Sequence, residues 1–298
     1  MIKAIKSMAL LLAVILLDAV FYQAFISPVI MQWGASAEEA GAALPGDRLA
    51  PFASSTRAIT IDAPRETVWQ WLVQLGGDRG GFYSYTFLEN LLGYHNDNAI
   101  TIVPAFQEMK VGRVVPSTPP TAGGSDKISW PVVGVEPGRS FVLQGWGAFV
   151  LREAGPARTR LLVRTHGWDT PTLLSKAEYF FIMPLHYLME RRMLMGIKDR
   201  AERGPGAPLS PLGDYLWAAG LFLSAVALMA LVFLARGPLG ALWALGYSFL
   251  WLWAGLVLAP LPVFALALLG LGIAAVFWAW LGKRGGSAGD GLGKRLKL

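Results

Sequence analysis

The chain has 298 residues, of which 54% are hydrophobic and only 15% are charged; soluble proteins carry about 25% charged residues, so part of this chain is expected in lipid. The net charge is +6. The surplus basic residues lie beside apolar segments, as in membrane proteins, and form no basic face, so we expect no nucleic-acid partner. The absence of cysteine excludes disulfides, a thiolate nucleophile and cysteine metal sites.

The first predicted element is an apolar helix over residues 8–31, preceded by Lys3 and Lys6. It is long enough to cross a bilayer, so residues 1–32 are predicted to form a transmembrane anchor. A cleaved signal peptide is the alternative, because small residues follow at 35–37. Asp18 lies inside this helix, where we expect a protonated carboxyl that hydrogen-bonds to a neighbouring helix. Residues 33–56 are predicted to form an extended linker.

A strand over residues 57–62 and a helix that begins near Pro64 follow. Glycine pairs at 76–77 and 80–81 then lead into an aromatic run and a short helix over residues 86–92. This loop lacks the ending of a phosphate-binding loop and comes after a helix. We therefore interpret it as a tight turn, with Gly80 or Gly81 at positive φ.

The middle of the chain is strand-rich. Strands are predicted over residues 100–103, 111–115, 128–135, 140–145, 148–152 and 159–165, with turn signals between them, including one at residues 116–124. A strand, two helices and then consecutive antiparallel strands is the order of an α+β fold.

Alternation in the last of these strands separates two faces. One carries Arg160, Leu162, Arg164 and His166, and the other carries Leu161, Val163 and Thr165. We expect the apolar second face to point inward, because burying an arginine without a partner is costly. The polar face inward is the alternative, with Glu89 as the partner of an inward Arg164 or Arg79.

A long helix is predicted over residues 175–203. Its first half is apolar almost all round at residues 179–189, and Pro184 is expected to kink it. Apolar helices over residues 212–235, 239–259 and 261–281 follow, so residues 211–282 are predicted to form a three-helix transmembrane region. The basic, glycine-rich tail over residues 283–298 is predicted to be disordered.

The strand and first helix carry a family resemblance. After the strand come Ala63-Pro64 and Val68-Trp69-x-Trp71-Leu72-x-x-Leu75. This string resembles the opening of the SRPBCC superfamily, which includes START lipid-transfer domains, polyketide cyclase-like proteins and the birch pollen allergen. The continuation Gln74-Leu75-Gly76-x-x-Arg79-Gly80-Gly81-Phe82-Tyr83-Ser84-Tyr85-x-x-Leu88-Glu89-Asn90 resembles a membrane-attached bacterial branch.

The resemblance implies that residues 57–203 form a helix-grip domain, in which a curved antiparallel sheet surrounds one long C-terminal helix. It also implies a ligand cavity between the two. The side chains that we expect to line it are Trp69, Leu72, Phe82, Tyr83, Trp146, Phe180, Met183 and Tyr187, with Glu89, Arg164 and His166 as its orienting polar groups.

Catalytic and metal chemistry find little support in the sequence. His95, His166 and His186 are scattered without ligand spacing, and no Gly-x-Ser-x-Gly motif is present. We therefore assign no catalytic residue, no metal and no cofactor. The leading hypothesis is a membrane-tethered module that binds a hydrophobic or lipid-like small molecule. A cyclase- or dehydratase-type enzyme, or a structural or partner-binding membrane protein with a filled cavity, are the alternatives.

Charge also predicts an orientation. Four spans place both termini on one side, and the spans are flanked by eight basic residues: Lys3, Lys6, Arg236, Lys283, Arg284, Lys294, Arg295 and Lys297. The positive-inside rule puts these residues in the cytoplasm. We therefore expect an integral protein of the bacterial cell membrane with cytoplasmic termini and an extracytoplasmic helix-grip domain.

Overall fold

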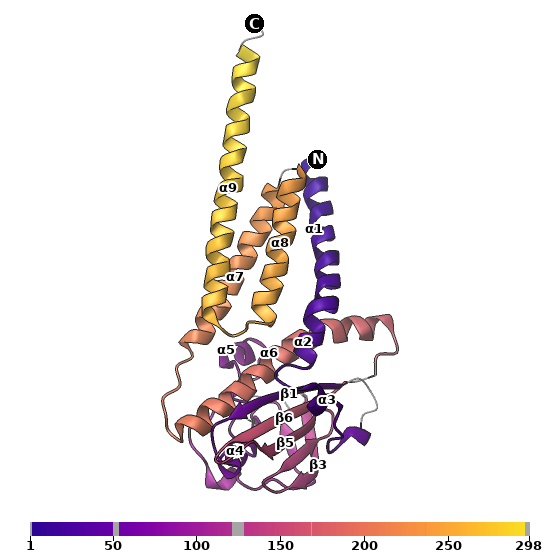
Figure 1. The fold of residues 1–298 in the computed structure, drawn as a ribbon, viewed down its shortest axis with the longest axis vertical. Coiled ribbons are helices and arrows are strands. Elements are labelled where there is room, and N and C mark those ends of the chain that lie inside the picture. Colours follow the sequence, from indigo (N-terminus) through magenta and orange to yellow (C-terminus); the bar gives the residue numbers. More distant parts are fainter. Residues whose placement is uncertain (1, 50–53, 121–127, 168, 236, 296–298) are drawn as a thin grey trace. The chain divides into compact units, whose positions relative to one another are not determined.

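The computed structural model describes residues 2–49, 54–120, 128–167, 169–235 and 237–295. The chain forms two compact units (Figure 1): one is Ile30–Leu209, and the other combines Met1–Val29 with Ser210–Leu298. Residues 50–53 of the predicted linker and 121–127 of a predicted turn lie outside the described residues.

The Ile30–Leu209 unit is built on a six-stranded antiparallel sheet with the order β1-β6-β5-β4-β3-β2. Its strands are β1 (Ser54–Ile61), β2 (Val114–Pro116), β3 (Ser129–Glu136), β4 (Ser140–Leu143), β5 (Gly147–Glu153) and β6 (Thr159–His166). Strands β2 to β6 follow one another as neighbours, and β1 closes the sheet against β6, with Ser54 opposite His166. With the long helix α6 packed on this sheet, the predicted α+β class is confirmed.

Two local predictions are wrong. Residues 100–103 form no strand, because the side chain of Gln74 occupies their backbone groups: it donates to Thr101 O (3.3 Å) and accepts from Val103 N (2.6 Å). The predicted extended linker contains helix α3 (Ala37–Gly41), which begins with a capping box between Ser36 and Glu39.

Besides α3, the described residues of this unit form the α-helices α4 (Arg65–Leu72), α5 (Thr86–Leu91) and α6 (Leu173–Arg203). Figure 1 shows α6 running across the sheet. It begins with a capping box of Thr172 and Ser175, ends at Gly204 and continues through Pro184 as one helix. The main core lies between α4, the second half of α6 and one face of the sheet, where Leu161 and Val163 are fully buried. The expectation that these two residues face inward is confirmed.

The opposite face of the sheet has its own smaller core, which contains Leu162, Ala148 and Val142 together with Leu44. Arg164 extends over this face and donates to the carbonyl oxygens of Glu39, Ala40 and Ala42. The guanidinium therefore satisfies carbonyl groups at the end of α3.

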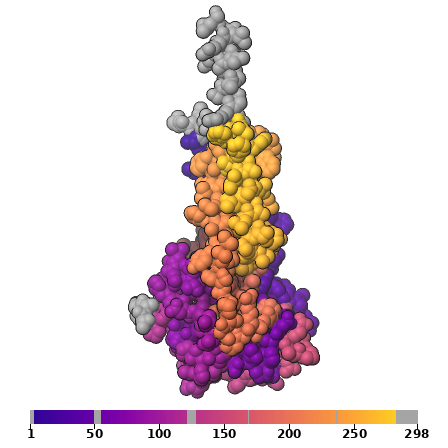
Figure 2. All heavy atoms as spheres, turned by 90° about the vertical axis from the view of Figure 1, so that its left-hand side faces the viewer, coloured from indigo at the N-terminus to yellow at the C-terminus, as the bar shows by residue number. Residues whose placement is uncertain are grey.

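Within the described residues, four helices are long and apolar enough to span a membrane: Ala4–Met31, Leu212–Leu234, Gly237–Leu256 and Pro262–Leu281. They belong to the second unit, except for the last two residues of the first helix, Ile30 and Met31. The first combines α1 (Ile2–Phe21), a π-helical turn (Tyr22–Ile26) and α2 (Ser27–Met31); the others belong to α7 (Leu212–Leu234), α8 (Gly237–Leu256) and α9 (Pro262–Arg295). Figure 2 shows α9, in yellow, alongside α7, in orange.

Asp18 of α1 accepts a hydrogen bond from the Ser248 hydroxyl of α8 at 2.8 Å. The expected bond from this carboxyl to a neighbouring helix is therefore confirmed. Helix α9 continues past its apolar part to Arg295, through the stretch for which the sequence predicted disorder, and no proline interrupts it there.

Candidate functional site

The glycine-aromatic loop between α4 and α5 is a closed turn. Gly76 and Gly81 pair as an isolated β-bridge, and both have positive φ, +134° and +71° respectively. The expectation of a positive φ at Gly80 or Gly81 is thus confirmed at Gly81, a conformation that favours glycine. Arg79 donates to the carbonyl oxygens of Val73, Phe106 and Glu108. These bonds fix the loop and so position the side chains that follow it.

Helix α6 approaches this loop closely at Gly196. A Cβ added to Gly196 would lie only 2.1 Å from the carbonyl oxygen of Tyr83. Tyr83 is itself fully buried, and Gln74 donates to its hydroxyl at 3.2 Å. The absence of a side chain at Gly196 therefore lets the loop pack directly on the helix.

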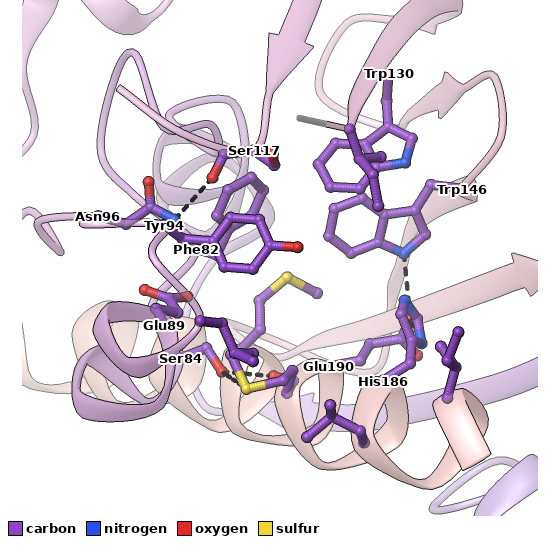
Figure 3. Close-up of a pocket in the computed structure, with 16 residues that line it drawn as sticks. Phe82, Ser84, Glu89, Tyr94, Asn96, Ser117, Trp130, Trp146, His186 and Glu190 are labelled. Atoms are coloured by element: carbon purple, nitrogen blue, oxygen red, sulfur yellow. Dashed lines mark hydrogen bonds and ion pairs between the residues drawn. The ribbon is translucent and has the colours of Figure 1, made fainter. Parts of the chain in front are cut away.

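A cavity of about 220 Å³ lies beside α6, and we call it the α6 cavity (Figure 3). It is lined by the glycine-aromatic loop, α5, the segment after α5, β3, the β4–β5 turn and the middle of α6. The lining residues are Phe82, Ser84, Glu89, Leu92, Tyr94, Asn96, Ser117, Ile128, Trp130, Trp146, Ile182, Leu185, His186, Met189, Glu190 and Met193.

Three of these side chains form an aromatic wall: Phe82, Trp130 and Trp146. The ring centroids of Trp130 and Trp146 are 4.7 Å apart, and Phe82 lies 5.9 Å and 5.8 Å from them. Such tilted and edge-to-face pairs are favourable arrangements for aromatic rings. The wall gives the cavity a large, rigid apolar surface.

Glu89, Asn96 and Ser117 form the opposite, polar end, which we call the acceptor end. Figure 3 shows Glu89 and Asn96 across the cavity from Trp130 and Trp146. The Asn96 amide donates to Ser117 O at 3.0 Å. Burial raises the pKa of Glu89 to about 7, although a hydrogen bond with Asn96 acts in the opposite direction. Glu89 is therefore a carboxyl that changes charge near neutral pH.

Glu190 of α6 lines the cavity and belongs to a buried ionic network. Its carboxylate accepts hydrogen bonds from Arg57 (2.6 Å), from the Trp146 indole (3.2 Å) and from the Thr165 hydroxyl. Burial acts to raise the pKa of Glu190, but the charge of the Arg57 guanidinium and the hydrogen bonds from Thr165 and Arg57 outweigh it and hold that pKa below its ordinary value. The network therefore keeps Glu190 ionised and fixes the orientation of Trp146.

His186 lies one helical turn before Glu190, with its ring 6.0 Å from that of Trp146. Its Nδ1 is 3.9 Å from Glu190 Oε2, too far for a hydrogen bond. Burial lowers the pKa of His186, and Arg57 adds to this effect, while Glu190 acts against it. The imidazole is therefore neutral at physiological pH.

Three of the residues that the sequence proposed for the site line the α6 cavity: Phe82, Glu89 and Trp146. Trp69, Leu72 and Tyr83 belong to the main core or pack against it. Phe180, Met183 and Tyr187 lie on α6 outside the lining. Arg164 and His166 lie on the opposite face of the sheet, where both reach Asp47, at 2.8 Å and 3.7 Å.

Sequence reasoning missed the contribution of α6 in particular. The side chains that it presents to the cavity are Ile182, Leu185, His186, Met189, Glu190 and Met193. Their spacing of three and four residues is the pattern of one helical face. Tracing that face forward from Ile182 would have found them. Trp130, Asn96 and Ser117 carry no comparable signal, because the sheet and loops bring them in from distant parts of the chain.

Within the described residues, no group of three or more histidines and carboxylates is placed to hold a metal ion. No protein-family model, no curated protein and no solved structure matches this chain.

Proposed function

We propose that this protein is a membrane-tethered module that binds a small hydrophobic molecule in the α6 cavity. The observation that carries the proposal is the lining itself: aromatic, leucine, isoleucine and methionine side chains surround a few buried polar groups. This combination is typical of small-molecule sites, in which apolar contacts give affinity and a few polar groups fix orientation. Methionine side chains such as Met189 and Met193 adapt to ligands of different shape.

The size of the cavity narrows the ligand. Drug-sized molecules occupy pockets of about 300–1,000 Å³, larger than the 220 Å³ found here. The ligand is therefore a compact molecule, or one part of a lipid-like molecule. Four lining residues are partly exposed: Leu92, Ile128, Ile182 and Leu185. We propose that they form the apolar mouth through which such a ligand enters.

The family assignment is part of the proposal. We infer that the Ile30–Leu209 unit is a helix-grip domain of the SRPBCC superfamily. The resemblance in the string Val68-Trp69-x-Trp71-Leu72 and the packing of a long C-terminal helix on an antiparallel sheet both support this inference. A ligand cavity beside the long helix is what the superfamily resemblance implies.

Native mass spectrometry of the detergent-purified full chain tests the proposal. We expect the protein to retain a small hydrophobic molecule, or to take one up when it is added, at a stoichiometry of one. A protein that remains without bound mass under all conditions would contradict the binding function. It would favour the structural or partner-binding alternative.

One observation favours a second function, an enzyme of the cyclase or dehydratase type. Glu89, with a pKa of about 7, faces the cavity that also receives the neutral imidazole of His186. A carboxyl near its pKa at working pH suits general acid–base catalysis. Under this alternative, Glu89→Gln abolishes turnover of the bound molecule. Under the binding function the molecule is recovered unchanged from the wild-type protein.

We further propose that the four apolar helices span the bacterial cell membrane, with both termini in the cytoplasm and the Ile30–Leu209 unit outside. The support is the placement of all eight flanking basic residues on one side of four spans. Because the chain contains no cysteine, single cysteine substitutions report topology without background.

Two single-cysteine variants test this topology: Lys110→Cys, at a side chain that is 66% exposed, and Leu298→Cys at the C-terminus. An impermeant maleimide added to spheroplasts is expected to label the first variant directly and the second only after lysis. Labelling of both variants before lysis, or of Leu298→Cys alone, would overturn the proposed topology.

A further inference from the structure

The acceptor end of the α6 cavity contains buried polar atoms that lack partners. Among the described residues, Glu89 Oε2, Asn96 Oδ1 and Ser117 Oγ find no hydrogen-bond partner. The three residues are only 3%, 2% and 4% exposed. Buried polar groups in folded proteins are almost always hydrogen-bonded, so three partnerless atoms at one end of one cavity indicate a missing ligand group.

The chemistry of these atoms indicates what that group is. A carboxylate oxygen and an amide oxygen accept hydrogen bonds, and a hydroxyl oxygen accepts as well. The orientation of the Asn96 amide is set by the bond that its nitrogen donates to Ser117 O, which leaves Oδ1 as the free acceptor. The ligand group must therefore be a hydrogen-bond donor.

Charge narrows the choice among donors. Within the part of the chain that the structure describes, no cationic side chain forms a salt bridge with Glu89, and Arg57 pairs with Glu190 instead. A cationic ligand supplies the charge that the carboxylate lacks, and charge-assisted hydrogen bonds are about twice as strong as neutral ones.

We infer that the α6 cavity takes a compact apolar molecule that carries a protonated amine, with the amine donating to Glu89 and the apolar body against the aromatic wall. This inference rests on the proposed binding function and names the class of its ligand. Asn96 and Ser117 complete the site as further acceptors.

Three probes of equal size separate the contribution of the ligand's charge to affinity from that of its apolar ring. They are 1-cyclohexylethylamine, 1-cyclohexylethanol and cyclohexanecarboxylate, which are cationic, neutral and anionic on the same ring. Their affinities for the full chain in detergent are measured by isothermal titration calorimetry. We expect the amine to bind about tenfold or more tightly than the alcohol, and the carboxylate to bind more weakly than both.

Glu89→Gln is the variant that assigns the preference to one residue. It keeps the shape of the side chain and removes its charge. Because burial raises the pKa of Glu89 to about 7, the wild-type protein loses stability as the pH rises from the ordinary range for glutamate through about 7. Glu89→Gln removes this loss and is expected to fold. The amine should lose its advantage over the alcohol in this variant, while the affinity of the alcohol changes less than about twofold.

The unmodified protein gives an independent measurement. Amine binding should weaken as the pH falls through about 7, where Glu89 takes up its proton. The other titratable groups that face the cavity are His186 and Glu190 of α6 and Tyr94. Loss of the pH dependence in Glu89→Gln would assign it to Glu89 rather than to His186.

The outcomes distinguish this inference from the function on which it rests. If the alcohol or the carboxylate binds the wild-type protein as tightly as the amine, or if Glu89→Gln leaves the preference for the amine unchanged, the amine assignment is wrong and the binding function stands. If none of the three probes binds and no molecule co-purifies, both are overturned.

Discussion

Replacing Arg57 with methionine is expected to lower the free energy of unfolding of the Ile30–Leu209 unit by about 3–5 kcal/mol. Arg57 and Glu190 are both inaccessible at their side chains and are joined at 2.6 Å. The substitution leaves the Glu190 carboxylate buried without its cation. Urea unfolding of the full chain in detergent, followed by tryptophan fluorescence, measures the change.

The double variant Arg57→Met with Glu190→Met is the control. It removes both charges, so it should recover most of the lost stability, because a buried ion pair replaced by apolar side chains of similar size is often nearly neutral. A double variant no more stable than Arg57→Met alone would contradict this account. It would mean that other contacts dominate instead: packing of the Arg57 side chain over the Tyr187 ring, 5.0 Å from its centroid, or the hydrogen bonds that Trp146 and Thr165 donate to Glu190.

The pH dependence of this pair follows from the direction of its shift. The pKa of Glu190 is lowered in the folded protein, so the unfolded state binds more protons in the acidic range. The stability that the pair contributes is present at neutral pH and is lost as the pH falls below the ordinary range for glutamate. Arg57→Met should remove that acidic loss.

Gly196→Ala is expected to destabilise the same unit by about 3 kcal/mol. The new Cβ would lie 2.1 Å from Tyr83 O and 2.8 Å from Tyr83 Cβ, so helix and loop must separate. Because Phe82 and Ser84 flank Tyr83 and line the cavity, ligand binding should weaken together with stability. The same urea unfolding experiment reports the effect.

Gly41→Ala is the matched control for Gly196→Ala. Gly41 ends α3, its φ is not positive, and a Cβ there meets nothing within 4 Å. Alanine is the better helix former, so this variant should be neutral or slightly more stable. Equal losses in the two variants would show that the close approach of loop and helix at Gly196 is not the cause.

Patterns that act within one element predicted much of the fold. Alternation predicted β6 and its inward face, because a strand turns successive side chains to opposite sides. Apolar length predicted the four long helices, and the apolar first half of α6 pointed to the helix beside the cavity. In these cases the periodicity of the sequence carries the structural information directly.

Long-range pairing explains what the sequence did not reveal. Arg57 and Glu190 are 133 positions apart in the sequence, and no local pattern around either residue indicates that it is buried with a partner. The Gln74 side chain forms the hydrogen bonds with residues 101 and 103 that a neighbouring strand would otherwise form. The apolar run at these positions gives no sign of that contact. Arg164 and His166 face away from the cavity because β6 is covered on both sides, and segment 37–49 is the cover.

The central claim is that the α6 cavity is a binding site, and the most direct test is to fill its mouth. Ile182 lines the cavity and is 48% exposed, so tryptophan there blocks entry at little cost in stability. Phe181→Trp is the control on the same helix, at a side chain that is 73% exposed and outside the lining. In native mass spectra, Ile182→Trp should lose the bound molecule while Phe181→Trp retains it. Undiminished binding in Ile182→Trp, or equal loss in both variants, would contradict the account.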